Sequence, residues 1–410
     1  MKRLQKQIES YAGTNIAYLA NGGTWLTLAK ILGFITAFAS SVVFANVLPE
    51  EVYGNYRFFL TLIALFSLTT LPGLNTATTR ATALGDGGIF WHAKKMKIRW
   101  GIIGSLLSIA TGLYYSFIIG NPTLLIPSII IALFIPFLEP FNLYHYFLNG
   151  KKDFRSITIY TSTIRFFTTV FLIGIALLAP DAIWLIVGYL VITLLGRSIA
   201  SSMTKPGGRP LSEKKTADHI QYGKRLSVLF LATEISVYLD KILVYTLLSP
   251  AMLAAYYLSF IPYKQTKNFL SSINTLAMPK FSANSAKTIR ATLPKKMMKL
   301  YLIIIPLIIL FWLVAKPIFS FIYPKYPESI FFAQLLMLQL AFYPFTLFTT
   351  SFSALKQTKR LYVTTISGAL LRIIGILICI PIWGPVGAIV AILIARTMQA
   401  IIETIFFFYE

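Results

Sequence analysis

The sequence has little charge, and acidic residues are the scarcest part of it. Only 12% of the 410 residues are charged and just 14 are acidic, whereas 56% are hydrophobic. Charged residues normally make up about 25% of a soluble globular domain. The composition therefore excludes an ordinary soluble protein and predicts a polytopic membrane protein.

Cysteine and histidine are also rare. Cys379 is the only cysteine, which excludes an intramolecular disulfide and a cysteine metal cluster. His92 and His219 lie in loops without metal spacing, and His145 stands between two tyrosines, as residues of an interfacial aromatic belt do. No Walker loop is present, and the GDGG run at 85–88 is a turn. We therefore expect no metal, no catalytic residue, no resident cofactor and no enzyme activity.

Long apolar stretches fill almost the whole chain. A helix needs about 20 residues to cross a bilayer, and about twelve stretches approach this length. We predict an all-α fold of about twelve transmembrane helices in two six-helix bundles around a central cavity. The approximate spans are 25–47, 56–83, 98–119, 124–148, 157–178, 183–203, 226–248, 251–276, 300–321, 330–353, 362–382 and 386–408.

The net charge of +23 would suggest nucleic acid in a soluble protein, but its distribution favours a membrane topology. The turns 46–53, 120–123 and 180–182 contain no basic residue, and the exception is 316–328, with Lys316 and Lys325. By the positive-inside rule, both termini and the basic loops are cytoplasmic in a bacterial inner membrane. Residues 1–20 are expected along the inner interface. The basic loops contain Lys2, Arg3 and Lys6; Lys94, Lys95, Lys97 and Arg99; Lys151, Lys152 and Arg155; Lys205, Arg209, Lys214 and Lys215; Lys287, Arg290, Lys295 and Lys296; and Lys356, Lys359 and Arg360.

Two halves are recognisable in the sequence. The polar stretch 205–218 is rich in Gly, Pro and Lys and lies near the midpoint, so it predicts a linker between bundles 1–204 and 219–410. A shift of 200 positions places Leu48, Gly54 and Tyr56 on Leu248, Ala254 and Tyr256. Six helices per half give a parallel pair, related by an axis along the membrane normal, that can rock about a central site.

Basic residues deep inside apolar spans point to function. A cation at the bilayer centre costs about 2.5–3.5 kcal/mol on insertion scales, so several cations require a hydrated cavity or an anionic partner. On 251–276, Lys264, Lys267, Ser271 and Asn274 share one helix face, and comparable polar stripes carry Arg165 and Arg372. Arg can hold phosphate oxygens in a bidentate fork, and Lys adds a point charge. The predicted site for pyrophosphate or an anionic glycan comprises Lys30, Arg57, Arg165, Lys241, Lys264, Lys267 and Arg372.

Simpler roles are open for some of these residues. Lys30, Arg57, Arg197 and Arg396 lie within about two turns of a span end and could reach the interface without a role in transport. Lys241 could pair with Glu234, or with an acid on a neighbouring helix, as a structural contact. Excess cations without acids nevertheless favour a ligand for the deeper positions.

Three intramembrane acids could couple transport to an ion gradient. Glu139, Glu234 and Asp240 could bind Na⁺ or H⁺, or they could merely neutralise nearby cations. We favour neutralisation somewhat over coupling.

Three segments resemble a known family. FANVLPEEVYGNY at 44–56, the Asp240 and Lys241 pair within 238–257, and IPIWGPVGAIVA at 380–391 are similar to segments of polysaccharide (O-antigen type) repeat-unit flippases. These belong to the multidrug, oligosaccharidyl-lipid and polysaccharide exporter superfamily, and the likeness in helix count and halves extends over nearly the whole chain. Lys30 also fits the basic cavity of related peptidoglycan-precursor flippases.

The resemblance implies movement of an undecaprenyl-pyrophosphate-linked oligosaccharide from the cytoplasmic to the outer leaflet. Expected partners are this lipid-linked substrate, the bilayer, and a polysaccharide polymerase or other glycan-assembly proteins, with no nucleic acid. Two alternatives are a cation-coupled multidrug exporter of the same superfamily and a non-transporting scaffold of a glycan-synthesis complex. An exporter of cationic drugs would favour acids in its cavity, and a scaffold would not need polar stripes.

Overall fold

The computed structural model describes residues 16–206, 213–282, 284–355 and 357–409, which form helices and turns with no strand among them. By contacts these residues divide into two compact units. The first contains 1–47 and 62–231, and the second contains 48–61 and 232–410. The segment predicted along the interface lies mostly outside the described residues, as do residues 207–212 of the predicted linker, whereas its residues 213–218 begin α10. The bundles 1–204 and 219–410 as rocking bodies stay a prediction.

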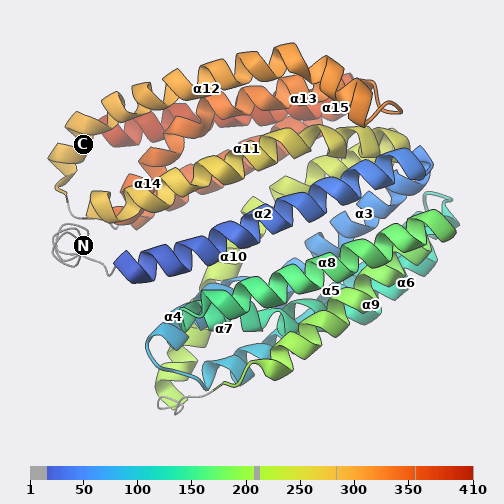
Figure 1. Ribbon diagram of the computed structural model, residues 1–410, viewed down its shortest axis with the longest axis horizontal. Coiled ribbons are helices and arrows are strands. Elements are labelled where there is room, and N and C mark those ends of the chain that lie inside the picture. The colour runs from blue at the N-terminus through green and yellow to red at the C-terminus, as the bar shows by residue number, and fades with distance from the viewer. Residues whose placement is uncertain (1–15, 207–212, 283, 356, 410) are drawn as a thin grey trace. The chain divides into compact units, whose positions relative to one another are not determined.

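The first part of the chain forms eight α-helices and two short 3₁₀ turns in the described residues before the linker (Figure 1). Within the first unit α2 packs against α8, α5 against α6, and α9 against both α6 and α8. The bounds are α2 Ile16–Val47, α3 Glu50–Ser67, η1 Leu68–Thr70, α4 Gly73–Ala83, α5 Ile89–Phe117, η2 Pro122–Leu124, α6 Leu125–Phe141, α7 Leu143–Gly150, α8 Phe154–Leu178 and α9 Ala182–Met203, where η marks short 3₁₀ turns.

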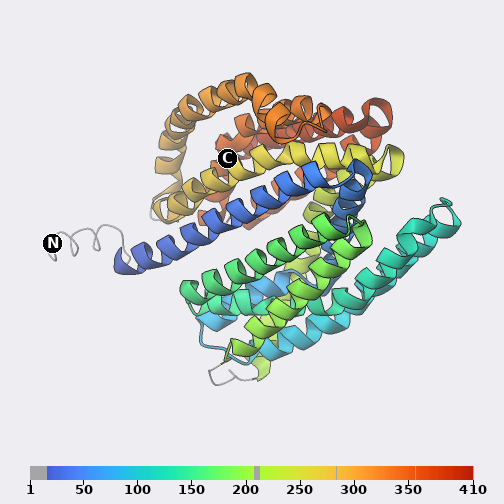
Figure 2. The ribbon, with the colours of Figure 1, turned by 45° about the vertical axis from the view of Figure 1, so that its right-hand side comes forward.

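The second part of the chain continues in the same helical pattern. In the second unit α11 packs against α13 and α14, and α12 packs against α13. Figure 2 shows the curvature of α12, which contains three prolines that each remove a helical hydrogen bond. The bounds are α10 Glu213–Leu247, α11 Pro250–Ser282, α12 Ala286–Ile322, α13 Glu328–Met337, η3 Leu338–Phe345, α14 Thr346–Ala354 and α15 Thr358–Phe408.

Local sequence signals fix several helix ends. The side chains of Asp153, Asp181 and Ser285 cap α8, α9 and α12 by accepting hydrogen bonds from backbone N–H groups of the first turn. Leu71 has a φ of 59° before Pro72, and the chain bends by 55° between the α3–η1 segment and α4. Gly384 divides α15 with a φ of 58° and a ψ of −138°. The broken α15 therefore supplies two helices.

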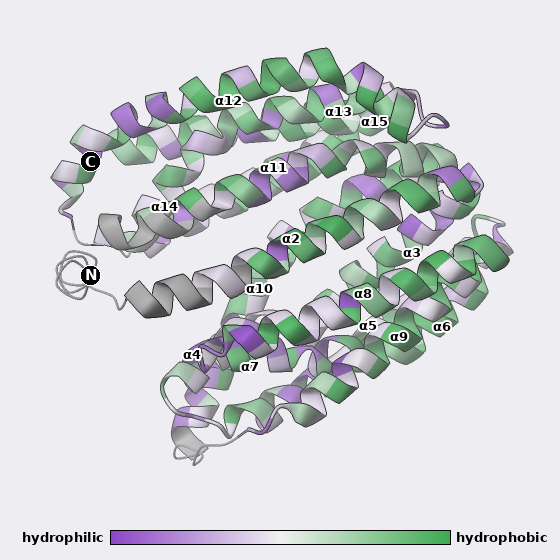
Figure 3. Ribbon diagram, viewed as in Figure 1, coloured by the Kyte–Doolittle hydropathy of each residue, from purple (hydrophilic) through white to green (hydrophobic). Residues whose placement is uncertain are grey.

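The predicted all-α membrane fold is confirmed, and the predicted count of about twelve helices is compatible with this arrangement. Eight described helices are long and apolar enough to cross a membrane, or nine if the bent α3 and α4 form one span. The predicted spans correspond to α2, α3 with α4, α5, α6 with α7, α8, α9, α10, α11, α12, α13 with α14, and the two parts of α15. Hydrophilic residues interrupt α11, so composition alone does not identify this helix as a span (Figure 3).

Large apolar side chains cover the outer surfaces of the helices. Leu178 and Phe321 are each 88% exposed, and Leu302 and Leu313 on α12 are each 73% exposed. Such extensive apolar exposure is unusual for a soluble surface and suits contact with lipid. The chain is a multi-pass membrane protein.

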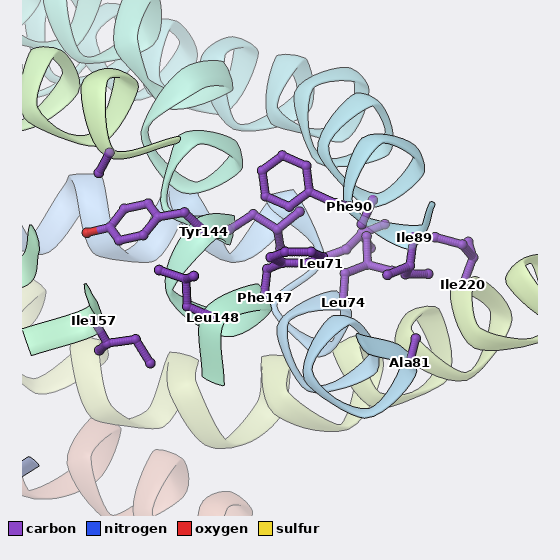
Figure 4. Packing of buried hydrophobic residues seen from close by; sticks show 13 residues of the cluster. Leu71, Leu74, Ala81, Ile89, Phe90, Tyr144, Phe147, Leu148, Ile157 and Ile220 are labelled. Atoms are coloured by element: carbon purple, nitrogen blue, oxygen red, sulfur yellow. The ribbon is translucent and has the colours of Figure 1, made fainter. Parts of the chain in front are cut away.

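Each unit has its own hydrophobic core. In the first unit Phe90 of α5, Phe147 of α7 and Leu74 of α4 interdigitate, and all three are fully buried (Figure 4). In the second unit one cluster gathers Phe348, Phe352 and Phe407 from α14 and α15. These cores hold the helices that carry the charged residues described next.

Candidate anion-binding site

Asp240 is the centre of a buried charge network in the second unit. It is fully buried, and its Oδ1 accepts a hydrogen bond from Lys241 Nζ at 2.9 Å. Its Oδ2 accepts from Arg372 Nη2 at 3.2 Å and from the Tyr256 hydroxyl at 3.0 Å. A buried carboxylate needs such donors, because desolvation of an unpaired charge is costly. One acid therefore balances two cations and leaves a net positive charge.

Three more cations lie close to this network. The positive charges of Arg396, Arg372 and Lys264 act on Lys267, and those of Lys264 and Arg372 act on Lys241. Lys264 and Lys267 make no ion pair with any described residue. We call Lys241, Lys264, Lys267, Arg372 and Arg396 the cationic cluster. Its carboxylates in the described residues are Asp240 and Glu403, so cations exceed acids by five to two.

A cavity of about 210 Å³ lies beside the cluster, between α10 and the two parts of α15. Arg372 and Arg396 line it from opposite sides of the break at Gly384. Arg372 Nε is buried and has no hydrogen-bond partner among the described residues. The other polar residues around the cavity are Thr233, Ser236, Thr365 and Gln399.

Arg396 belongs to a hydrogen-bonded row along the last part of α15. Its Nη1 donates to Gln399 Oε1 at 3.0 Å, and Gln399 Nε2 donates to Glu403 Oε1 at 3.0 Å. Glu403 is only 4% exposed. The sequence analysis missed Glu403 as an intramembrane acid, although spacings of three and four residues place all three side chains on one helix face.

Arg57 lies in an aromatic cage that is also part of the second unit. Its Nη2 donates to the Tyr53 hydroxyl at 2.7 Å, and its guanidinium carbon lies 3.8 Å from the Tyr257 ring centre. Arg57 is 9% exposed, so it does not reach the interface as the simpler interpretation allows. A desolvated cation over an aromatic ring contributes about 2 kcal/mol. The cage gives Arg57 a structural role, and its contact with substrate stays a prediction.

The remaining predicted cations, Lys30 and Arg165, belong to the first unit. Both are exposed, and Arg165 of α8 lies against Gly33 of α2. The Thr158 hydroxyl, two turns earlier on α8, donates to Trp25 O at 2.9 Å. Arg165 makes no ion pair with a described residue, as the sequence predicts.

Several sequence expectations need correction. Arg372 was expected to lack an acid, yet Asp240 balances it; Lys241 pairs with Asp240 and not with Glu234. Arg197 does not reach for the interface, because its Nη1 donates to Glu139 Oε1 at 3.0 Å. Lys97 does not belong to a cytoplasmic loop.

Lys97 lies on α5, and its side chain is fully buried. Its Nζ donates to Asn75 Oδ1 at 3.0 Å, and the charge of Glu139 also acts on it. Glu139 therefore pairs with Arg197, and its charge also favours the charged form of Lys97. Glu234 makes no ion pair with a described residue, so it is the predicted coupling acid that is not engaged in this way.

Comparison with known proteins places this arrangement in a family. The profile of the polysaccharide biosynthesis protein family matches residues 19–285, about two thirds of the chain. The chain belongs to the polysaccharide biosynthesis protein family. A comparison with curated protein sequences gave no match.

Solved structures of transporters share the fold of this polysaccharide biosynthesis protein. The lipid II flippase MurJ in an inward closed conformation is similar with a TM-score of 0.69 and 16% identity, covering 94% of this chain and 87% of that chain. An outward-facing multidrug resistance MATE family transporter of the MOP superfamily has a TM-score of 0.58 and 15% identity, covering 95% and 94%. The Vibrio cholerae MATE transporter VcmN has a TM-score of 0.60 and 13% identity, covering 98% and 97%.

Proposed function

We propose that this protein is a flippase that moves an undecaprenyl-pyrophosphate-linked oligosaccharide from the cytoplasmic to the outer leaflet by alternating access. Membership of the polysaccharide biosynthesis family supports a glycan cargo, and the fold likeness to a lipid II flippase supports a lipid-linked one. The observation that carries the proposal is the cationic cluster, in which five cations face two carboxylates.

A pyrophosphate supplies the missing negative charge. Lys264 and Lys267 have no carboxylate to neutralise them in the described residues, and Arg372 keeps an unpartnered Nε after binding Asp240. Excess cations inside a membrane protein are costly unless an anion or water compensates them. Arg and Lys contacts to phosphate oxygens are charge-assisted and strengthen where water is excluded. The polyprenyl chain, which is apolar, stays in the lipid.

The multidrug exporter is the second candidate, because MATE transporters share this fold. A cavity for cationic drugs would need carboxylates, and the excess of cations opposes it. Expression of this protein should therefore leave the sensitivity of a host cell to cationic drugs unchanged. The scaffold hypothesis requires that transport-site residues be dispensable, so the next experiment tests it as well.

Complementation of glycan export in a flippase-null cell tests the proposal. We expect Lys264→Ala, Arg372→Ala and Arg165→Ala to reduce export at normal protein level. Loss of one charged hydrogen bond, worth about 1.5–3 kcal/mol, corresponds to about a ten- to hundredfold loss of affinity. Lys359→Ala, an exposed charge at the start of α15, is the matched control and should retain export. Undiminished export in all three variants would reject the predicted substrate site and favour a scaffold.

Coupling to Na⁺ or H⁺ is part of the same proposal, with Glu234 as the ion-binding residue. Glu139 and Asp240 are already engaged with cations, whereas Glu234 is half-buried without an ion pair in the described residues. In the same cells Glu234→Gln should weaken export under an imposed ion gradient. Equal export by the parent protein and by Glu234→Gln would contradict the role of Glu234 in ion coupling.

The polymerase and other glycan-assembly proteins are the proposed partners, and the cytoplasmic side of the inner membrane is the proposed site of entry.

A further inference from the structure

The two arginines that line the cavity between α10 and α15 have different partners. Arg372 donates to Asp240, so part of its charge serves the buried network. Arg396 makes no ion pair with a described residue, and its hydrogen bond to Gln399 uses only one terminal nitrogen. A guanidinium group has five N–H donors. The remaining donors of Arg396 are therefore available at the cavity wall.

The side chain of Gln399 holds Arg396 in place. Its amide accepts from Arg396 at one end and donates to the buried Glu403 at the other, which fixes the direction of the amide. Gly368 on the facing part of α15 leaves the space that Gln399 occupies, because a Cβ there would lie 2.8 Å from Gln399 Oε1. Arg396 is thus positioned by a neutral amide, and the carboxylate of Glu403, on which its charge acts, is bonded to that amide and not to the guanidinium.

The size and polarity of the cavity limit what it can hold. Its volume of about 210 Å³ is below the range of about 300–1,000 Å³ that is usual for drug-sized ligands. One small anion fits this volume, whereas a whole oligosaccharide would extend beyond it. Two arginines and the hydroxyl of Thr365 offer donors and no ionised acceptor at the wall.

We propose that this cavity binds a single phosphoryl group, with Arg396 as its main ligand and Arg372 as the second. Arg396 and a phosphate can form two parallel N–H to oxygen bonds. The assignment of that phosphoryl group to the lipid-linked substrate rests on the proposed function. The binding of inorganic phosphate or pyrophosphate in the cavity is independent of the proposed function. Arg396 is absent from the residues that the sequence analysis assigned to substrate.

Calorimetric titration of the purified full-length protein in detergent tests this proposal. The probes are inorganic phosphate, inorganic pyrophosphate and a short-chain polyprenyl pyrophosphate, each added separately. The variants are Arg396→Gln, Arg396→Lys and Gly368→Ala, with Lys359→Gln as the charge-matched control. Thermal unfolding of every variant establishes that it is folded before titration.

We expect Arg396→Gln to weaken binding of pyrophosphate at least tenfold and Lys359→Gln to leave it unchanged. Arg396→Lys should bind with intermediate affinity, because the charge remains while the fork is lost. Gly368→Ala should also weaken binding, because the added methyl group displaces Gln399. If Arg396→Gln does not fold, the comparison of Arg396→Lys with Lys359→Gln decides, and equal affinity there overturns the proposal.

The outcomes separate this proposal from the proposed function. Equal binding by the parent and Arg396→Gln, or no binding of any probe by the parent, overturns the cavity as a phosphoryl site. Binding of inorganic probes that depends on Arg396, without binding of the polyprenyl probe, supports the site and counts against a lipid-linked substrate. Arg396-dependent binding of all three probes supports both.

Discussion

At the scale of single residues, the main feature of this protein is its buried charged groups and the partners that hold them. Asp240 has no exposed surface and joins α10 to α15 through Arg372, while Lys241 lies 5% exposed beside it. Arg57 is held differently, by tyrosines and not by an acid. The surroundings of a buried arginine therefore differ with the groups that pack against it, an acid for Arg372 and tyrosines for Arg57.

Replacement of Asp240 by Asn should destabilise the protein strongly. Breaking a buried ion pair costs about 3–5 kcal/mol, because the partner charge is left uncompensated, and here two cations lose their acid. We expect a lower unfolding temperature in detergent for Asp240→Asn, and partial recovery when Lys241→Met is added. An unchanged unfolding temperature in the single variant would contradict the role of Asp240 as counter-ion.

At the scale of elements, breaks in helices matter as much as the helices themselves. Gly384 separates the two parts of α15, which bring Arg372 and Arg396 to the same cavity. Its φ of 58° and ψ of −138° belong to a region that is essentially restricted to glycine. An uninterrupted helix would carry the second arginine away from the first.

Gly384→Ala should cost about 1–3 kcal/mol of stability, because a Cβ is strained in that backbone conformation. Gly174→Ala on α8 is the matched control, since a Cβ at Gly174 meets no atom within 4 Å. We expect a lower unfolding temperature for the first variant and an equal or higher one for the second. A similar response of both variants would show that the break does not depend on glycine.

Sequence could predict the spans but only part of the site. Span length follows from bilayer thickness, so apolar stretches located most of the spans without tertiary information, although hydrophilic residues interrupt α11. The ionic partners could not be predicted, because Asn75 reaches Lys97 from another helix and Asp240 meets Arg372 across 132 positions. The row from Arg396 through Gln399 to Glu403 is the exception, since helical spacing alone aligns it.

At the scale of the whole molecule, charge asymmetry predicts the orientation. Because basic residues gather in alternate loops, the positive-inside rule predicts the termini and the start of α12 on the cytoplasmic side. It predicts the turn between α8 and α9 and the one between α12 and α13 on the opposite side. This orientation is part of the proposed function, because substrate entry is cytoplasmic.

Single-cysteine labelling can test this orientation, since Cys379 is the only native cysteine. In a Cys379→Ala background, Pro180→Cys and Pro324→Cys should react with a membrane-impermeant thiol reagent in intact spheroplasts. Lys287→Cys and Lys359→Cys should react only after the membrane is permeabilised. All four positions are exposed, so access differs by side of the membrane and not by burial. The reverse pattern would invert the topology.

The allocation of residues 48–61 to the second unit bears on how the protein is made. The Tyr245 hydroxyl donates to Asn55 Oδ1 at 2.7 Å, a bond that spans 190 positions, and Gly54 packs on the backbone of Pro250. A ribosome completes α3 long before it reaches either partner. The N-terminal part of α3 therefore lacks these native contacts in the nascent chain until α10 and α11 have been inserted.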